Sequence, residues 1–310
     1  MRAHDTPRWP AALGRVAATA LGAVLLLAAY AKAIDPLAFA SQLRDLLPLP
    51  AALAHSLAVT IIAGEAALGT ALVSGWRRPS VLLLTNAAFL LFLGIVLWQW
   101  WHPGTAGMSC GCFGALLERT PAQAVGEDLA FVCLSGLAWL GRPQAPTTSQ
   151  TGRILLTCLG FAAGLALAIA APALPLDDHA TALAPGVTIA ATHLDEIIPA
   201  LRNGRHLVVL LDRGDSNSAA DVARLNQGLQ LPTGRTPVWG IADDDPALAA
   251  AFLWSAGPAF EIRSAPARML RTLYRTLPRT ALIDAGHVVQ TWSGLPPDIA
   301  LDTLARGDLP

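Results

Sequence analysis

The chain has 310 residues, of which 54% are hydrophobic and only 14% are charged, and its mean hydropathy is +0.48. Ordinary soluble domains carry about 25% charged residues, so this composition excludes a wholly soluble protein. The formal net charge of −1 gives no electrostatic basis for binding nucleic acid. The four cysteines all fall within the first 158 residues, and the remainder of the chain has none, which excludes a disulfide-stapled secreted scaffold.

Five apolar segments are long enough to cross a bilayer, which needs about 20 apolar residues. The first also resembles a signal peptide, because Ala31-Lys32-Ala33 has the small residues of a cleavage site, but a retained helix is the preferred interpretation. The sequence thus predicts an α-helical integral membrane bundle of about five transmembrane helices over residues 1–174, followed by a Pro/Asp/Ala linker over 175–186. The predicted spans are 13–33, 51–74, 80–101, 122–140 and 154–174.

Basic residues are unevenly shared between the two sides of this bundle. If the N-terminus is cytoplasmic, more of them lie inside than in the outer short loops, which is the usual bias of membrane proteins. The distribution predicts a multi-pass protein of the inner membrane with its C-terminal domain in the periplasm. The inner set is Arg2, Arg8, Arg15, Arg77, Arg78, Arg142 and Arg153, and the outer set is Lys32, Arg44 and Arg119.

The loop between the third and fourth spans contains the motif Met108-Ser-Cys-Gly-Cys-Phe-Gly114. A disulfide between Cys110 and Cys112 would close a very small ring, so it would be strained and easily reduced, as catalytic disulfides are. The motif therefore favours a redox-active pair, with Cys133 in the fourth span as a candidate resolving thiol. Two alternatives stay open: unpaired cysteines in a Gly-rich turn, and a Cu(I) site formed by Met108, Cys110, Cys112 and His102.

Charged residues inside membrane spans are costly and are usually functional. Glu65, near the middle of the second span, is a candidate proton relay or hydrogen-bond hub. Glu127 and Asp128 either handle protons near the cysteine loop or are favourably placed at a helix N-terminus. Lys32, at the outer end of the first span, either has such a role or snorkels to the interface.

The second half of the chain alternates between strand and helix patterns. Buried strands are predicted over 206–212, 237–242 and 280–284, and an Ala285-Gly286 turn leads into a further strand over 287–292. Helices are predicted over 218–227, 246–254 and 298–306. This pattern predicts an α/β domain over 187–310.

The order of these elements resembles a thioredoxin-like domain. Pro278 resembles the cis-proline of that family, and Asp284-Ala-Gly-His-Val-Val resembles its hairpin. In the corresponding alignment the family's Cys-x-x-Cys falls on Asp215 to Ser218, and neither residue can exchange disulfides. The resemblance implies a degenerate domain that binds a client or a thiol–disulfide partner.

The membrane half resembles the MauE/DoxX-like family of redox-associated membrane proteins. The matching residues are Tyr30-Ala-Lys32 before Asp35-Pro36, Glu65, and above all Cys110-Gly-Cys-Phe-Gly114 before the span that contains Asp128. The resemblance implies a role in forming disulfides during maturation of exported proteins, such as a methylamine dehydrogenase subunit. In such a system the membrane protein works beside a thioredoxin-like partner.

These observations lead to the hypothesis of a membrane thiol–disulfide protein with Cys110 and Cys112 as its redox pair. Its partners would be the lipid bilayer and an exported client, and its electrons would pass to a quinone near Trp98 to Trp101 or to a second thiol protein. Two further hypotheses remain: a Cu(I)-handling membrane protein, and a non-catalytic scaffold that assembles a client enzyme outside the membrane.

Overall fold

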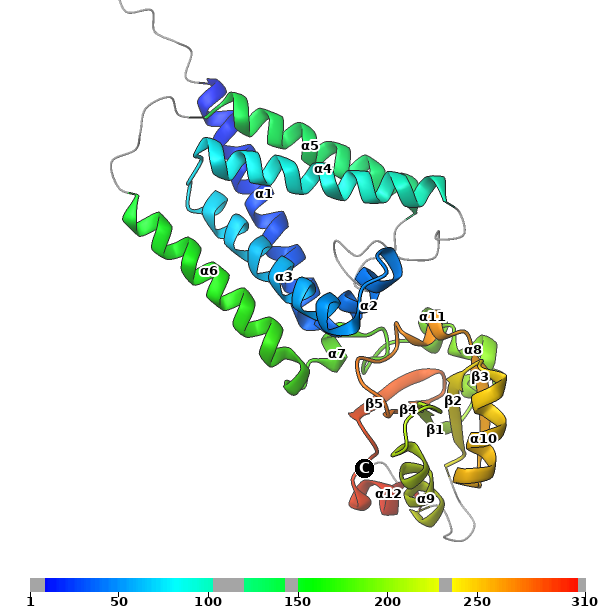
Figure 1. The fold of residues 1–310 in the computed structure, drawn as a ribbon. Helices are drawn as coiled ribbons and strands as arrows, with labels where there is room; N and C mark the ends of the chain where they lie inside the picture. The colour runs from blue at the N-terminus through cyan, green and yellow to red at the C-terminus, as the bar shows by residue number, and fades with distance from the viewer. Residues whose placement is uncertain (1–8, 103–119, 143–149, 229–235, 306–310) are drawn as a thin grey trace, which may run out of the picture. The chain divides into compact units, whose positions relative to one another are not determined.

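The computed structural model describes residues 9–102, 120–142, 150–228 and 236–305 (Figure 1). The chain divides into two compact units, Met1–Leu174 and Pro175–Pro310. Unit 1 is helical, whereas unit 2 contains a sheet with helices.

Unit 1 contains the expected membrane helices. Four helices in the described residues are long and apolar enough to cross a membrane: α1, α3, α4, and α6 with the short helix η3 that continues it. The fifth predicted span is also a helix, α5, but Gln123, Glu127 and Asp128 make it more polar, and it is not among the four. Of the five predicted spans, four are thus confirmed as helices of membrane length and apolarity, and the fifth stays a prediction. The helices of unit 1 are α1 (Trp9–Ile34), α2 (Pro36–Leu46), α3 (Ala51–Val73), α4 (Pro79–Trp101), α5 (Pro121–Leu140), α6 (Thr151–Ala170) and η3 (Ala171–Ala173).

Neighbouring helices in this bundle run antiparallel and pack closely at small residues. A Cβ atom at Gly22 would lie 2.8 Å from the Gly69 carbonyl oxygen, so α1 and α3 touch through their backbones. A Cβ atom at Gly14 would lie 2.6 Å from the Cα of Gly141, which places the start of α1 against the end of α5. In Figure 1, α6 runs beside α3, and α4 runs beside α5. These contacts fix which residues of α1, α3 and α5 face one another.

One helix of unit 1, α2, is not predicted by the sequence analysis. Asp35 caps it, with its Oδ1 accepting a hydrogen bond from the Ala38 amide at 3.0 Å, and Pro36 occupies the first turn. The Asp35-Pro36 break therefore ends α1 and starts a second, shorter helix at once.

Unit 2 is built on a five-stranded sheet of order β3-β2-β1-β4-β5. Strands β1, β2 and β3 are parallel, and β4 and β5 pair antiparallel at the other side. This arrangement is consistent with the expected thioredoxin-like α/β domain. Its elements are α7 (Asp177–Ala180), η4 (Ile189–Thr192), α8 (Leu194–Ile197), η5 (Pro199–Arg202), β1 (Arg205–Leu210), α9 (Ser218–Gly228), β2 (Val238–Asp243), α10 (Pro246–Ala256), β3 (Glu261–Ala265), α11 (Ala267–Leu270), β4 (Arg279–Asp284), β5 (His287–Ser293) and α12 (Asp298–Ala305).

Both faces of this sheet are covered, which explains why β1 is apolar throughout. Leu207 and Val209 face a core shared with α9, α10 and α12. Val208 and Leu210 face the opposite core, which is completed by Leu183 and by the short helices before β1. Strands buried on both faces have continuous rather than alternating apolar sequences.

The segment 175–186, expected to be a linker, is instead part of unit 2. Leu183 is fully buried in the core beneath the sheet. In α7, Asp178 Oδ1 accepts hydrogen bonds from Arg279 Nη2 at 2.7 Å and from Thr291 Oγ1 at 2.5 Å. The carboxylates that made the segment look like a solvated linker are therefore bound to β4 and β5.

Strand β3 is the strand that the sequence analysis misses. Its residues Glu261, Arg263 and Ser264 are exposed, because it is the edge strand beside β2. Edge strands in natural proteins commonly carry charged residues, so their sequences lack a clear apolar pattern.

Candidate functional site

A buried ion pair joins α1 and α3 inside the membrane unit. Lys32 Nζ lies 2.5 Å from Glu65 Oε1, and their side chains are 2% and 5% exposed. The Lys32 ammonium also lies 5.4 Å from the ring centre of Phe39 and 5.1 Å from that of Phe92. The expectation that Lys32 snorkels to the interface is therefore wrong: its side chain points to Glu65, because an isolated carboxylate in this environment would be costly.

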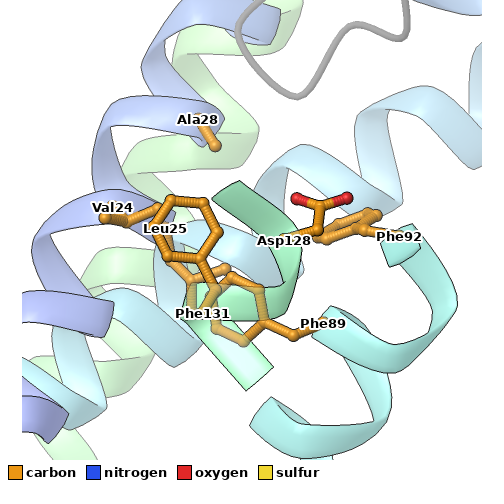
Figure 2. A pocket seen from close by; sticks show the side chains of 7 residues that line it. All are labelled: Val24, Leu25, Ala28, Phe89, Phe92, Asp128 and Phe131. Carbon is orange, nitrogen blue, oxygen red and sulfur yellow. The ribbon is translucent and has the colours of Figure 1, made fainter. Parts of the chain in front are cut away.

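A second buried carboxylate, that of Asp128, lies in a small pocket between α1, α4 and α5. Figure 2 shows this carboxylate beside the ring of Phe92, and Phe89 and Phe131 also line the pocket. The space open to the centres of water-sized spheres is about 10 Å³, which is about what one water molecule needs. The remaining lining residues, Val24, Leu25 and Ala28, come from α1.

Phe92 connects the pocket to the ion pair. The Phe92 ring lies next to the Lys32 ammonium, and Phe92 also lines the pocket that contains Asp128. Ala28, another pocket residue, lies one helical turn before Lys32. Phe92 is therefore a common neighbour of the Lys32–Glu65 pair and of the buried Asp128, which come from three different helices.

The two neighbouring carboxylates of α5 differ in environment. Asp128 is 3% exposed, whereas Glu127 is on the exposed surface of the helix. Because α5 begins at Pro121, Glu127 and Asp128 are its seventh and eighth residues. A helix N-terminus stabilises carboxylates only within the first turn, and both residues lie beyond that turn. Of the two alternatives for these residues, stabilisation by the helix N-terminus is therefore wrong. Cys133, on the same helix, is a free and exposed cysteine.

The cysteine pair itself, Cys110 and Cys112, lies outside the described residues, as does Met108. The described residues on either side of the loop are His102, at the end of α4, and Thr120, which caps the start of α5. Asp128 is seven residues into α5, about 10 Å along the helix from its start. Asp128 thus lies in the half of α5 that begins at the cysteine loop.

The end of α4 that leads to this loop is aromatic. Trp98, Trp100 and Trp101 are all exposed, as interfacial tryptophans are. The ring of His102 stacks on Trp98 with 4.8 Å between centroids, and its Nδ1 donates to the Trp98 carbonyl at 2.8 Å. Within the described residues, no group of three or more His, Cys, Asp or Glu side chains is arranged to hold a metal ion.

In unit 2, the residues at the thioredoxin-like position form a structured turn. The backbone amide of Ser218 donates to the Asp215 carbonyl at 3.1 Å, and Ser218 is buried at the start of α9. Burial raises the pKa of Asp221, one turn further along, and the charge of Asp215 adds to this effect. The Leu277–Pro278 peptide bond is cis.

Arg213, which the sequence analysis does not identify, lies in the same turn and is buried. Its guanidinium donates to the Asp243 carbonyl and, at 3.1 Å, to Ser264 Oγ. It thereby joins the ends of the three parallel strands β1, β2 and β3, beside the turn of residues 215–218. The signal available in the sequence is a single arginine directly after a buried strand.

Residues 10–141 match the family model described as methylamine utilisation protein MauE. No curated protein matches the chain. The match spans α1 to α5 and includes Lys32, Glu65, Asp128 and both cysteines of the loop. Together with the membrane-length helices, it identifies a multi-pass membrane protein. The membrane region of the chain, over residues 10–141, is therefore similar to the MauE family.

Proposed function

We propose that this protein is a membrane thiol–disulfide oxidoreductase that forms disulfides in exported proteins, with Cys110 and Cys112 as its redox pair. The observation that supports the proposal is the set of buried charged side chains in the spans, Lys32, Glu65 and Asp128, of which Asp128 lies on the helix that follows the cysteine loop. Buried charges in membrane spans mark sites of proton or ion transfer.

The exchange proceeds in two steps. A client thiolate attacks one sulfur of the Cys110–Cys112 disulfide, forming a mixed disulfide and releasing the other cysteine as a thiolate. A second client thiol then resolves the mixed disulfide. The client loses two electrons and two protons, and the cysteine pair gains them.

A membrane quinone is the acceptor that returns the pair to its disulfide form. It takes up two electrons and two protons and becomes a hydroquinone, so protons must move from the thiols into the membrane. Asp128 and Glu65 are suited to transfer these protons. A carboxylate close to a thiol raises the thiol's pKa, so the role of Asp128 is proton transfer and not thiolate stabilisation.

The pocket beside Asp128 is too small for a quinone ring, since it has room for about one water molecule. The exposed tryptophans at the end of α4 are the better candidates for a quinone contact. The pocket would instead hold a water molecule that connects Asp128 to the loop.

Unit 2 would bind the client rather than oxidise it. The sequence has no cysteine beyond Cys158, so this unit cannot exchange disulfides. The family description points to methylamine utilisation, and an exported enzyme of that process is the proposed client class. Arg15, Arg77, Arg78, Arg142 and Arg153 lie at the end of unit 1 opposite the cysteine loop. They favour a cytoplasmic N-terminus in the inner membrane, with unit 2 on the periplasmic side.

The test is a redox titration of the full chain, with thiols trapped by an alkylating mass tag across thiol buffers of known potential. Replacing Cys133 and Cys158 by serine leaves Cys110 and Cys112 as the only thiols. We expect a reversible two-electron transition between about −270 and −120 mV, the range of known oxidoreductases. The pair of background substitutions is the matched control, because both residues are exposed on helices of the same unit.

Substituting Cys110 or Cys112 by serine should abolish this transition and the oxidation of an exported client. If both thiols remain reduced in every oxidising buffer, the proposal is wrong.

A further inference from the structure

Five arginines gather at the end of unit 1 that lies opposite the cysteine loop. They come from different parts of the chain: the start of α1, the turn between α3 and α4, the end of α5, and α6. We call this set the arginine end, and it consists of Arg15, Arg77, Arg78, Arg142 and Arg153.

The close contact between Gly14 and Gly141 brings several of these arginines together. Arg15 and Arg142 each directly follow one of the two glycines. Arg77 Nη1 donates to the Gly141 carbonyl at 3.1 Å. Three arginines from three elements are therefore gathered around one helix crossing.

Arg77 is the central member of the set. Burial lowers its pKa, and the positive charges of Arg15 and Arg153 lower it further. An arginine nevertheless keeps its charge in proteins. Its Nε is buried and has no hydrogen-bond partner in the described part of the chain. The arginine end thus holds like charges close together, and the Nε–H group of Arg77 is a buried donor without a partner among the described residues.

The carboxylates of the described part of unit 1 lie away from this end. The nearest along the helices is Glu65, which is eight residues, or about 12 Å, from the end of α3. Glu65 is already paired with Lys32. Within the described residues, the arginine end is therefore a positively charged surface, which attracts anions.

An apolar groove begins next to this charge. It lies between α4 and α5, contains about 420 Å³, and is lined by Leu83, Asn86, Gly136, Trp139 and Leu140. Trp139 also carries the Arg142 guanidinium over its ring, 4.4 Å from the centroid. A phosphate at the arginines and a hydrocarbon chain in the groove would therefore be contiguous.

We propose that the arginine end binds the phosphate of an anionic membrane lipid, with one acyl chain of that lipid in the groove between α4 and α5. Arginine forks bind phosphate oxygens with two parallel hydrogen bonds. The ends of membrane-length helices lie at the depth of lipid headgroups. The groove favours a lipid over a free phosphate ion, which would use the arginines alone.

The positive-inside bias alone accounts for basic residues on one side of a membrane. It does not require that arginines from separate helices converge, nor that one of them be partly buried beside an apolar groove. Those two features indicate a binding site.

The first test uses native mass spectrometry of the full chain with phosphatidylglycerol or the zwitterionic phosphatidylethanolamine. We expect the wild type to retain phosphatidylglycerol preferentially, and the double variant Arg77→Gln/Arg142→Gln to retain it at least about tenfold more weakly. Arg44→Gln is the matched control, since Arg44 is an exposed arginine on α2 at the other end of the unit. Equal retention of both lipids, or equal retention by the double variant, would overturn the proposal.

The second test separates a lipid from a free anion. A Cβ atom at Gly136 has nothing within 4 Å, so Gly136→Leu should fold normally while filling the groove. We expect this variant to lose phosphatidylglycerol, and millimolar inorganic phosphate not to displace the lipid from the wild type. If inorganic phosphate displaces the lipid and Gly136→Leu has no effect, the site binds a soluble anion and the lipid proposal fails.

Discussion

At the scale of single residues, the ion pair between Lys32 and Glu65 allows a structural role to be separated from a functional one. Lys32→Met would leave Glu65 buried without a compensating charge and should destabilise unit 1 by about 3–5 kcal/mol. The double variant Lys32→Met/Glu65→Leu removes both charges, so its stability should return to near that of the wild type. Denaturation in detergent micelles measures both effects as a double-mutant cycle.

Glu127→Gln serves as the control, because Glu127 is an exposed carboxylate of the same bundle. A stable double variant that still cycles Cys110 and Cys112 at the normal rate would make the pair purely structural. A stable double variant with slow reoxidation would support proton transfer through Glu65.

The sequence identifies Lys32 and Glu65 as unusual but does not predict that they pair. They are 33 residues apart, and their contact depends on the register of α1 against α3, which is set by the approach of Gly22 to Gly69. A register of this kind follows from three-dimensional packing and has no local pattern. The burial of Asp128 beside an exposed Glu127 depends on packing in the same way.

At the scale of elements, the segment before β1 tests how far unit 2 extends. Leu183→Ala removes a fully buried side chain from the core under the sheet and should destabilise unit 2 by about 2–5 kcal/mol. Limited proteolysis of the full chain, followed across a denaturant series, would measure the loss. Val289→Ala, at an exposed site on β5, should change stability by no more than about 0.5 kcal/mol. Equal protease resistance of both variants would show that residue 183 lies in a linker.

The elements that the sequence predicts well are those with long or strongly apolar patterns. Helices α1, α3, α4 and α6 and strands β1, β2 and β4 follow from apolar runs bounded by proline, glycine or polar residues. The missed elements include α2, β3 and α7, which are short or polar and are stabilised by a cap, by edge pairing or by ion pairs with distant residues. Asp177 shows why, since its partner Ser293 is 116 residues away and donates to its Oδ2 at 2.6 Å.

At the scale of the whole molecule, the chain joins a membrane unit that contains all four cysteines to an α/β unit that has none. A degenerate domain of this kind is useful to a redox protein if it raises the local concentration of the client at the cysteine loop. If the two units have these separate roles, unit 1 alone should determine the redox transition of the cysteine pair, and unit 2 should determine how much client is captured.

Truncation after Leu174 tests this division, because that boundary leaves the core of unit 2 undivided. The truncated chain should keep the two-electron transition of Cys110 and Cys112. In a Cys112→Ser background, Cys110 holds clients as mixed disulfides, and removing unit 2 should reduce the amount trapped by about tenfold or more. A cut after Gly186 is a poor substitute, because Leu183 and the aspartates of α7 would lose the sheet that buries and binds them. If the chain that ends at Leu174 traps as many clients as the full chain, unit 2 does not bind clients and must serve another role.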